Sequence, residues 1–328
     1  MRTLIIRDYG IKLRVRKGLI VIQSRKGSEV VPLGEVESIL ILTSGVSITS
    51  KVLRKLTSAG IQLAVADSRG MPVAVIHHPF TTKTVVTRRA QYESLHNGKA
   101  LEVVKVVATS KLGNQAGLLR RLRRATHIKE LTEAEERVLA VAEEVGRLRT
   151  SSIEELRQRV MNLEAEAART YWGALALTLP KELGFEGRDQ EGVDPVNAAL
   201  NYGYGILYSK AWSSVALVGL DPYAGFLHVD RSGKPVLVFD VVEVFRPVAV
   251  DYPIVKAFRS GAKLAIKSGL LDYESRAKVA RTVLEGLKEK FSGWGEVKEV
   301  EAWIKTFSLS LASYLRGDSE LRPLVFRW

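Results

Sequence analysis

The sequence contains no cysteine among its 328 residues. This absence excludes disulfide bridges, iron–sulfur clusters, zinc sites built on thiolates and enzymes that use a cysteine nucleophile. Histidine is also scarce, with five residues in the whole chain. Any metal site must therefore be built from carboxylate oxygens and very few imidazoles.

Long apolar runs are missing too. The longest ones, such as "ESILIL" and "VLVFDVV", are too short and too interrupted by charge to span a bilayer, and the first residues lack the basic-then-apolar pattern of a signal peptide. We therefore expect a cytoplasmic protein that has no membrane partner. With 46% apolar residues the chain can bury a substantial core, and its length is compatible with two domains.

Acidic residues are few in the first two fifths of the chain. Residues 1–130 contain 23 Lys and Arg against 8 Asp and Glu, whereas residues 131–328 contain 26 against 28. The net charge of +13 therefore arises in the N-terminal part. A basic surface of this size attracts polyanions by neutralising phosphates and releasing counterions. Nucleic acid is the expected partner, and a solvated basic surface of no special purpose is the alternative.

The spacing of apolar residues changes near residues 78–85. Before this point, short alternating segments separated by Gly and Ser turns predict strands, with one helix at residues 49–60. After it, helical spacing dominates. The sequence thus predicts a small β domain followed by a larger helical domain, whose helices are expected within residues 100–127, 132–148, 151–179, 194–216, 273–291 and 297–315.

The motifs of zincins, P-loops, dinucleotide-binding folds and nucleophile elbows are absent. What remains is a sparse set of one histidine and a few carboxylates. Glu164 lies on the same helical stripe as Tyr171, whereas Glu166 points elsewhere. Such a set of oxygen and imidazole ligands is typical of a hard divalent ion such as Mg²⁺ or Mn²⁺.

His228 follows a turn-rich loop and precedes the segment "GKPVLVFDVVEVFRP". The valines of this segment favour a strand, but its two prolines also suit the ends of a helix. In a helix Asp240 and Glu243 would share one face, and in a strand they would point to opposite faces. A further alternative makes His228 a hydrogen-bonded core residue and pairs Glu243 with Arg246.

The order of four runs decides between these alternatives. They are "EAEAARTYW" from Glu164, "NAALNYGY" from Asn197, "GLDPYAGFLH" from Gly219 and "DVVEVFRP" from Asp240. In this order they closely resemble the family of CRISPR-associated protein one, the CRISPR spacer integrase. The resemblance covers nearly the whole chain and includes "SKLGNQAGLLRRL" and the closing "LRPLVFRW".

The resemblance implies an α+β fold. A small N-terminal β-sandwich-like domain, residues 1–80, would serve dimerisation and DNA contact, and a larger all-helical C-terminal domain, residues 85–328, would be catalytic. It also favours a helix for residues 236–246. The implied alternative to an active enzyme is a catalytically silent relative that binds nucleic acid; a metallohydrolase of small phosphorylated compounds would not explain the basic excess.

Within the C-terminal domain the resemblance implies a catalytic metal site. Glu164, His228 and Glu243 match the family's ligands for Mg²⁺ or Mn²⁺, and Asp240 matches a nearby acidic position that supports or replaces a ligand. One departure is Ala165, where relatives often have glycine. The implied reaction is transesterification, in which the 3′-hydroxyl of a captured DNA fragment attacks a phosphodiester at the CRISPR repeat; with water as the nucleophile, the same site would act as a DNA endonuclease.

The implied partners are double-stranded and branched DNA, a second copy of the chain in a homodimer, and CRISPR-associated protein two. Basic and polar side chains of the C-terminal domain are expected to touch the DNA. These candidates are Arg120, Arg121, Arg123, Arg124, Arg169, Tyr171, Asn201, Tyr202 and Arg246.

Overall fold

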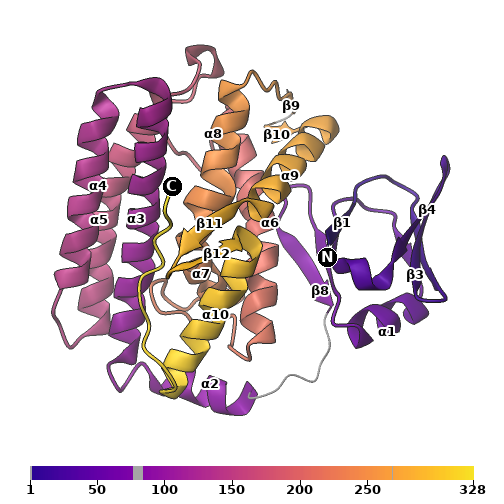
Figure 1. The fold of residues 1–328 in the computed structure, drawn as a ribbon, viewed down its shortest axis with the longest axis horizontal. Helices are drawn as coiled ribbons and strands as arrows, with labels where there is room; N and C mark the ends of the chain where they lie inside the picture. Colours follow the sequence, from indigo (N-terminus) through magenta and orange to yellow (C-terminus); the bar gives the residue numbers. More distant parts are fainter. Residues whose placement is uncertain (1, 77–83, 268) are drawn as a thin grey trace. The chain divides into compact units, whose positions relative to one another are not determined.

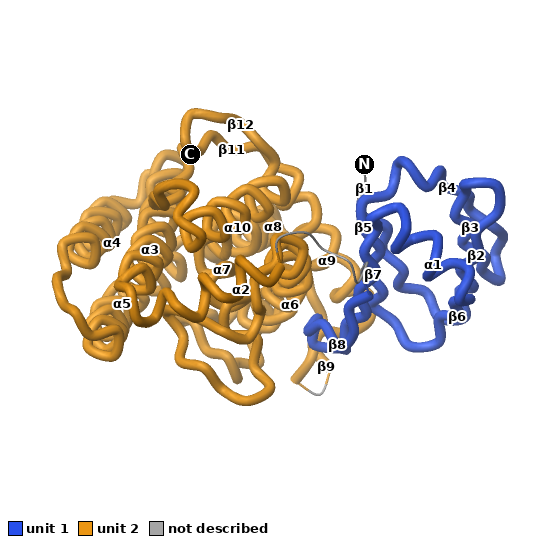
Figure 2. Tube along the Cα trace, turned by 90° about the horizontal axis from the view of Figure 1, so that it is seen from below, with its two compact units in different colours: residues 1–81 blue, residues 82–328 orange. Residues whose placement is uncertain are grey.

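A computed structural model describes residues 2–76, 84–267 and 269–328 of the chain (Figure 1). The chain divides into two compact units, Met1–Thr81 and Thr82–Trp328 (Figure 2). The segment at 78–85, where the sequence predicts a domain boundary, lies mostly outside the described residues.

The N-terminal unit contains two four-stranded sheets. The first has the order β1-β5-β7-β8, with β1, β5 and β7 parallel and β8 antiparallel to β7; the second has the order β4-β3-β2-β6. A single helix, α1 (Ser50–Ser58), connects β6 to β7. The strands are β1 (Arg2–Ile6), β2 (Lys12–Arg16), β3 (Leu19–Ser24), β4 (Gly27–Pro32), β5 (Val36–Ile41), β6 (Ser47–Ile48), β7 (Gln62–Ala66) and β8 (Pro72–Ile76), with a 3₁₀ turn at Leu33–Glu35.

Local sequence explains these elements well. In β2, Leu13 and Val15 are buried while the alternate basic residues are exposed, as the period of a half-buried strand requires. A tight turn with positive φ at Lys17 and Gly18 leads into the antiparallel strand β3. Thr49 caps α1 by accepting a hydrogen bond from the backbone of Val52. Side chains from both sheets and from α1 share one apolar core, which confirms the sandwich-like arrangement.

The C-terminal unit is built mainly of helices, and α3, α4 and α5 lie side by side (Figure 1). None of the helices in the described ranges combines the length and apolar character needed to cross a membrane. The helices are α2 (Thr84–Glu93), α3 (Lys99–Thr126), α4 (Glu130–Arg147), α5 (Ile153–Ala176), α6 (Pro195–Leu217), α7 (Val236–Arg246), α8 (Tyr252–Arg259), α9 (Tyr273–Lys288) and α10 (Val300–Arg316), with a 3₁₀ turn at Lys181–Leu183 and a π-helical turn at Pro247–Asp251.

This unit is not wholly helical, which corrects one detail of the prediction. Two short antiparallel ribbons interrupt the helices, and the second one separates α9 from α10. Trp294 and Gly295 both have positive φ and form its tight turn, so a helix cannot run through them. The ribbons are β9 (Ile266–Lys267) with β10 (Leu270–Leu271), and β11 (Lys290–Gly293) with β12 (Glu296–Glu299).

Residues 236–246 form the helix α7 despite their valines. Burial all around this helix overrides the strand propensity, because its apolar side chains pack against α3, α6 and α10. A helix that is apolar on every side belongs in an interior. The helical alternative for this segment is therefore confirmed, and α7 carries both Asp240 and Glu243 in the buried centre of the unit.

A segment at 321–328 runs along α3 (Figure 1) and is tied there by the buried side chain of Asn114. Asn114 Nδ2 donates to the carbonyl oxygens of Val244 in α7 at 2.9 Å and of Leu324 at 3.0 Å. Its Oδ1 accepts a hydrogen bond from the backbone N–H of Phe326 at 2.8 Å. One amide thus joins α3, α7 and this segment.

Replacing this amide tests its structural role. Asn114→Ala leaves three buried backbone groups short of a partner, and each such loss costs about 1–3 kcal/mol. We expect the free energy of unfolding, measured by denaturant titration, to fall by at least about 3 kcal/mol. The control Asn162→Ala, at an exposed position of α5, should change it by less than about 0.5 kcal/mol. Equal losses for the two variants would contradict this role.

Candidate active site

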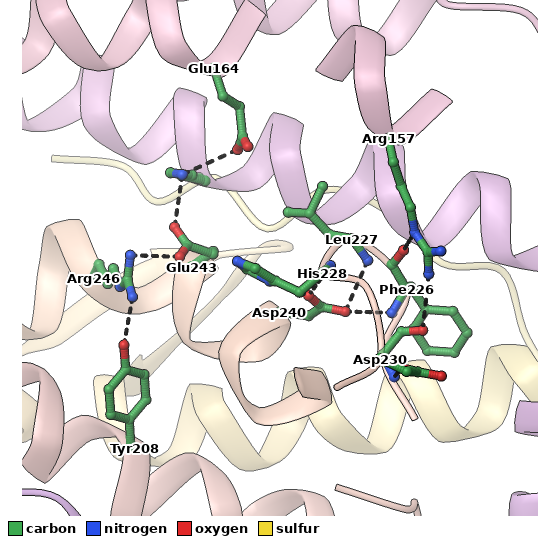
Figure 3. A network of polar contacts seen from close by, with 12 residues as sticks. Arg157, Glu164, Tyr208, Phe226, Leu227, His228, Asp230, Asp240, Glu243 and Arg246 are labelled. Atoms are coloured by element: carbon green, nitrogen blue, oxygen red, sulfur yellow. Dashed lines mark hydrogen bonds and ion pairs between the residues drawn. The ribbon is translucent and has the colours of Figure 1, made fainter. Parts of the chain in front are cut away.

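Two carboxylates from different helices meet around one lysine ammonium. Lys111 Nζ, from α3, lies 3.2 Å from Glu164 Oε1 of α5 and 2.9 Å from Glu243 Oε2 of α7 (Figure 3). Glu243 is buried, whereas the side chains of Glu164 and Lys111 remain 16% and 19% exposed. The cluster therefore lies where the interior of the unit opens to solvent.

The charges of this cluster shift the pKa values of Lys111 and Glu243. Burial alone would lower the pKa of Lys111, but the neighbouring carboxylates of Glu164 and Glu243 outweigh it and raise that pKa above its usual value. Burial would likewise raise the pKa of Glu243, yet the positive charges of Arg246 and Lys111 lower it to about 2. At neutral pH the lysine is protonated and Glu243 is ionised.

The second oxygen of Glu243 is held by Arg246. Nη1 of its guanidinium lies 2.6 Å from Glu243 Oε1, and Nη2 donates to the hydroxyl of Tyr208 at 2.6 Å (Figure 3). The same guanidinium lies over the ring of Tyr204 at 4.7 Å from its centroid. The pairing of Glu243 with Arg246, which the alternative interpretation of the sequence contains, is thus present, and it leaves Oε2 facing the ammonium of Lys111. Arg246 is therefore held by Glu243, Tyr208 and Tyr204, and 26% of its side chain remains exposed.

Asp240 organises the loop that carries His228. One carboxylate oxygen accepts the backbone N–H groups of Phe226 and Leu227, and the other accepts the N–H of His228. That second oxygen also lies 2.6 Å from Nδ1 of His228. Burial lowers the pKa of His228, but the hydrogen bond and charge of Asp240 raise it, and the net shift is upward. A proton on Nδ1 donated to Asp240 leaves the lone pair on Nε2.

The side chain of His228 remains 41% exposed. Its imidazole is directed from the loop toward Glu243 (Figure 3), and the two groups influence each other's pKa. The structure thus brings His228, Glu243 and Glu164 to one region. Asp240 lies behind the imidazole and holds it in place.

Two residues that sequence reasoning missed fasten the same loop from other helices. Gln91 of α2 is buried; its Nε2 donates to the carbonyl oxygens of Asp221 and Ala224, and its Oε1 accepts the N–H of Asp221. Arg157 of α5 donates to the carbonyl oxygen of Phe226 at 2.6 Å (Figure 3). Neither residue stands in a motif, and only the tertiary fold brings them to the loop.

Lys111 is the third residue that sequence reasoning missed. It stands within "SKLGNQAGLLRRL", in a stretch of α3 whose other side chains from 110 to 119 are buried. A lysine within such a buried stretch requires a partner of opposite charge. That requirement was the available signal in the sequence.

Tyr171 and Tyr202 do not fit their expected role as DNA contacts, because both side chains are buried. The hydroxyl of Tyr171 donates to Asp251 Oδ2 at 2.8 Å, and that of Tyr204 donates to Asp251 Oδ1 at 2.6 Å. Burial raises the pKa of Asp251, and the two hydroxyls act against this rise by stabilising its ionised form. Tyr171 therefore belongs to the interior hydrogen-bond network of the unit.

Removing the hydroxyl of Tyr171 tests whether this residue belongs to the interior or contacts DNA. Tyr171→Phe leaves a buried carboxylate one donor short, so we expect the free energy of unfolding to fall by about 1–3 kcal/mol while the affinity for DNA stays unchanged. Tyr223→Phe, at an exposed position, should alter stability by less than about 0.5 kcal/mol. If Tyr171→Phe bound DNA more weakly and kept its stability, the interpretation of Tyr171 as a DNA contact would be correct.

The remaining candidate DNA contacts differ in what surrounds them. Arg120 and Arg123 pair with Glu135 of α4 at 2.7 Å and 3.4 Å. The guanidinium of Arg121 lies over the ring of Tyr252. Three further positions are Asn201, half-buried and bonded to Arg188, and the exposed Arg124 and Arg169. Of the nine candidates, Arg124 and Arg169 offer the most accessible charge.

The donor set of the cluster fits a hard divalent cation, although its present spacing does not form a finished metal site. Across the described parts of the chain, no three His, Cys, Asp or Glu side chains are gathered closely enough to hold a metal ion. Lys111 takes the position between the carboxylates. Glu164 Oε1 and Glu243 Oε2 are buried, and both face its ammonium, at 3.2 Å and 2.9 Å. Two such oxygens beside an oriented imidazole suit Mg²⁺ or Mn²⁺.

The fold is shared with other solved structures. A casposase bound to integration product superposes with a TM-score of 0.81 at 23% identity, over 98% of this chain and 93% of that chain. A chain of a Cas6-RT-Cas1–Cas2 complex gives a TM-score of 0.75 at 17% identity, over 97% of this chain and 35% of that chain. At these identities the likeness establishes the fold, and it confirms the α+β architecture expected from the sequence.

Similarity in sequence identifies the family of this chain more specifically than the shared fold does. The sequence model of the family described as CRISPR associated protein Cas1 matches residues 4–283. CRISPR-associated endonuclease Cas1 2 of Pyrobaculum aerophilum is 39% identical over 283 residues, which are 86% of this chain and 90% of that relative. The chain therefore belongs to the Cas1 family.

Proposed function

We propose that this chain is a DNA endonuclease and integrase of CRISPR adaptation, which inserts captured DNA fragments into the CRISPR array. The observation that carries the proposal is the meeting of Glu164 and Glu243 beside the oriented imidazole of His228 in a member of the Cas1 family. The name of the Pyrobaculum relative as an endonuclease supports the nuclease activity, and the casposase bound to integration product supports strand transfer.

The site residues have separate tasks in this proposal. Glu164, Glu243 and Nε2 of His228 would hold a Mg²⁺ or Mn²⁺ ion. When bound, such an ion supplies positive charge that offsets the negative charge building up on the scissile phosphate. Asp240 keeps the proton of His228 on Nδ1, and Arg246 fixes the orientation of Glu243 through its other oxygen.

The proposed reaction exchanges one phosphodiester for another. The oxygen of a DNA 3′-hydroxyl forms a bond to phosphorus, its proton passes to solvent, and the bond from phosphorus to the original 3′-oxygen breaks. The departing oxygen takes up a proton, so no nucleotide cofactor is consumed. When water replaces the 3′-hydroxyl, the outcome is hydrolysis. The rigid loop and helix α7 would hold the reacting groups in line.

The proposed partners of the chain are suggested by its basic surface and by its membership of the Cas1 family. The exposed face of β2 carries Lys12, Arg14 and Arg16, so the N-terminal unit would contact DNA phosphates, and the same unit would mediate a homodimer. The Cas1–Cas2 complex among the solved structures supports assembly with Cas2. A silent DNA-binding relative is disfavoured because the full set of candidate catalytic side chains is present.

The catalytic assignment predicts loss of activity at selected carboxylates. Glu164→Gln and His228→Ala should each lower Mn²⁺-dependent strand transfer by at least about 100-fold, because charge on the phosphate is no longer offset, while DNA affinity is retained. Strand transfer is measured with a short duplex carrying free 3′ ends and a supercoiled plasmid.

Glu166→Gln provides the matched control, since Glu166 is exposed on the same helix two residues after Glu164. It should retain full activity. An active Glu164→Gln variant, or an inactive Glu166→Gln variant, would contradict the assigned site.

The basic face of β2 predicts a salt-dependent affinity. If six or more phosphates are contacted, DNA affinity should fall on the order of 10³-fold between 50 and 200 mM salt. Replacing Lys12, Arg14 and Arg16 by glutamine should reduce the steepness of the slope of log affinity against log salt concentration by up to about three. Fluorescence anisotropy with labelled duplex measures both quantities.

A second triple variant serves as the control, because its three arginines each pair with a glutamate one turn earlier on a helix. These are Arg137, Arg147 and Arg159. Their replacement by glutamine should leave the slope unchanged. Equal slopes for the two triple variants would place the DNA on another surface.

A further inference from the structure

Lys111 has no task in the proposed reaction, yet it occupies the centre of the site. Its ammonium lies within ion-pair distance of Glu164 Oε1 and Glu243 Oε2, which come from two other helices. Both facing oxygens are buried. The two carboxylates act on the ammonium mainly through their charge, and Glu243 also accepts a hydrogen bond from it.

Two like charges at such a position need a cation between them. Without one, the carboxylates of Glu164 and Glu243 would repel each other in a partly desolvated setting. A lysine ammonium is a compact point charge on a flexible stem, so it can enter such a position and leave it again. The guanidinium of Arg246, in contrast, is held by Glu243, Tyr208 and Tyr204.

We propose that Lys111 is a built-in counter-ion, whose ammonium neutralises Glu164 and Glu243 in the metal-free protein and is displaced when a divalent ion binds. This inference rests on the proposed metal site. Two consequences follow. The ammonium keeps α5 and α7 together around α3 before metal binds, and it weakens the affinity for the metal because the ion must first displace it.

The first test measures Mn²⁺ binding without DNA, by electron paramagnetic resonance of the free ion or by calorimetry. Lys111→Met keeps the length of the side chain and removes its charge, so the dissociation constant for Mn²⁺ should fall by about tenfold or more. Lys111→Arg keeps the charge and should not tighten binding.

Lys105→Met is the matched control. Lys105 lies on α3 with a side chain 17% exposed and pairs with Glu102 at 2.8 Å, away from the carboxylate pair. The Lys105→Met variant should bind Mn²⁺ with the same affinity as the wild type. Equal Mn²⁺ affinities for the wild type and Lys111→Met would overturn the proposal that Lys111 acts as a counter-ion.

Thermal unfolding supplies a second readout. In EDTA, Lys111→Met should unfold several degrees below the wild type, because the carboxylates lose their cation, and Mn²⁺ should raise its unfolding temperature by more than it raises that of the wild type. Equal rises would also overturn the inference.

A third measurement uses the wild type, so it does not depend on the folding of a variant. Reductive methylation followed by mass spectrometry reports the reactivity of each lysine amine. Lys111 should be protected in EDTA and react several times faster when Mn²⁺ is saturating, whereas Lys105 should not change. Continued protection of Lys111 with Mn²⁺ bound would overturn displacement.

The outcomes separate this inference from the proposed function. If neither the wild type nor Lys111→Met binds Mn²⁺ or Mg²⁺, the metal site itself fails. If both bind the ion with the same affinity and Glu164→Gln abolishes binding, the metal site stands and only the counter-ion is wrong.

Discussion

The structure of the site depends on the burial of two carboxylates on one apolar helix. Asp240 and Glu243 stand one turn apart on α7, where the side chains around them are buried. A buried charge is tolerated only when it is paired or hydrogen-bonded, so each carboxylate draws other groups toward α7. Asp240 gathers three backbone N–H groups and the imidazole of His228, whereas Glu243 gathers Arg246 and Lys111. The positions of the loop, of Lys111 in α3 and of the candidate catalytic groups on α7 thus depend on one electrostatic requirement.

Sequence patterns predicted what depends on neighbours along the chain. The turn at Gly18 and the start of α1 after Thr49 are local features, and they agree with the expected Gly turns between strands and with the helix expected at residues 49–60. For α7 the local signal was misleading: valines favour a strand, and burial on all sides of the segment decides for a helix. Only the order of family motifs anticipated that result. Lys111 and Gln91 escaped prediction, since their partners lie more than fifty residues away and no spacing rule connects them.

The misplaced DNA contacts have a different cause. Tyr171 stands on the same helical stripe as Glu164, and an aromatic beside a nuclease motif suggests a surface for bases or sugars. The same stripe faces inward at Tyr171, where the π-helical turn Pro247–Asp251 presents the carboxylate of Asp251 to its hydroxyl. Sequence spacing assigns residues to one side of a helix, but it does not reveal where along the helix that side passes from solvent into the interior.

Asn114 has a consequence for the order in which the protein acquires its structure. Its amide bonds the carbonyl oxygen of Val244, directly after Glu243, and two backbone groups of the segment at 321–328. During synthesis on the ribosome, α3 and α7 emerge long before that segment, so the bonds from Asn114 to Leu324 and Phe326 cannot form while the segment is still inside the exit tunnel. A nascent chain thus lacks the contacts that tie α3, α7 and this segment into one body. The region that holds Lys111 and Glu243 reaches its full set of bonds only after synthesis has passed residue 326.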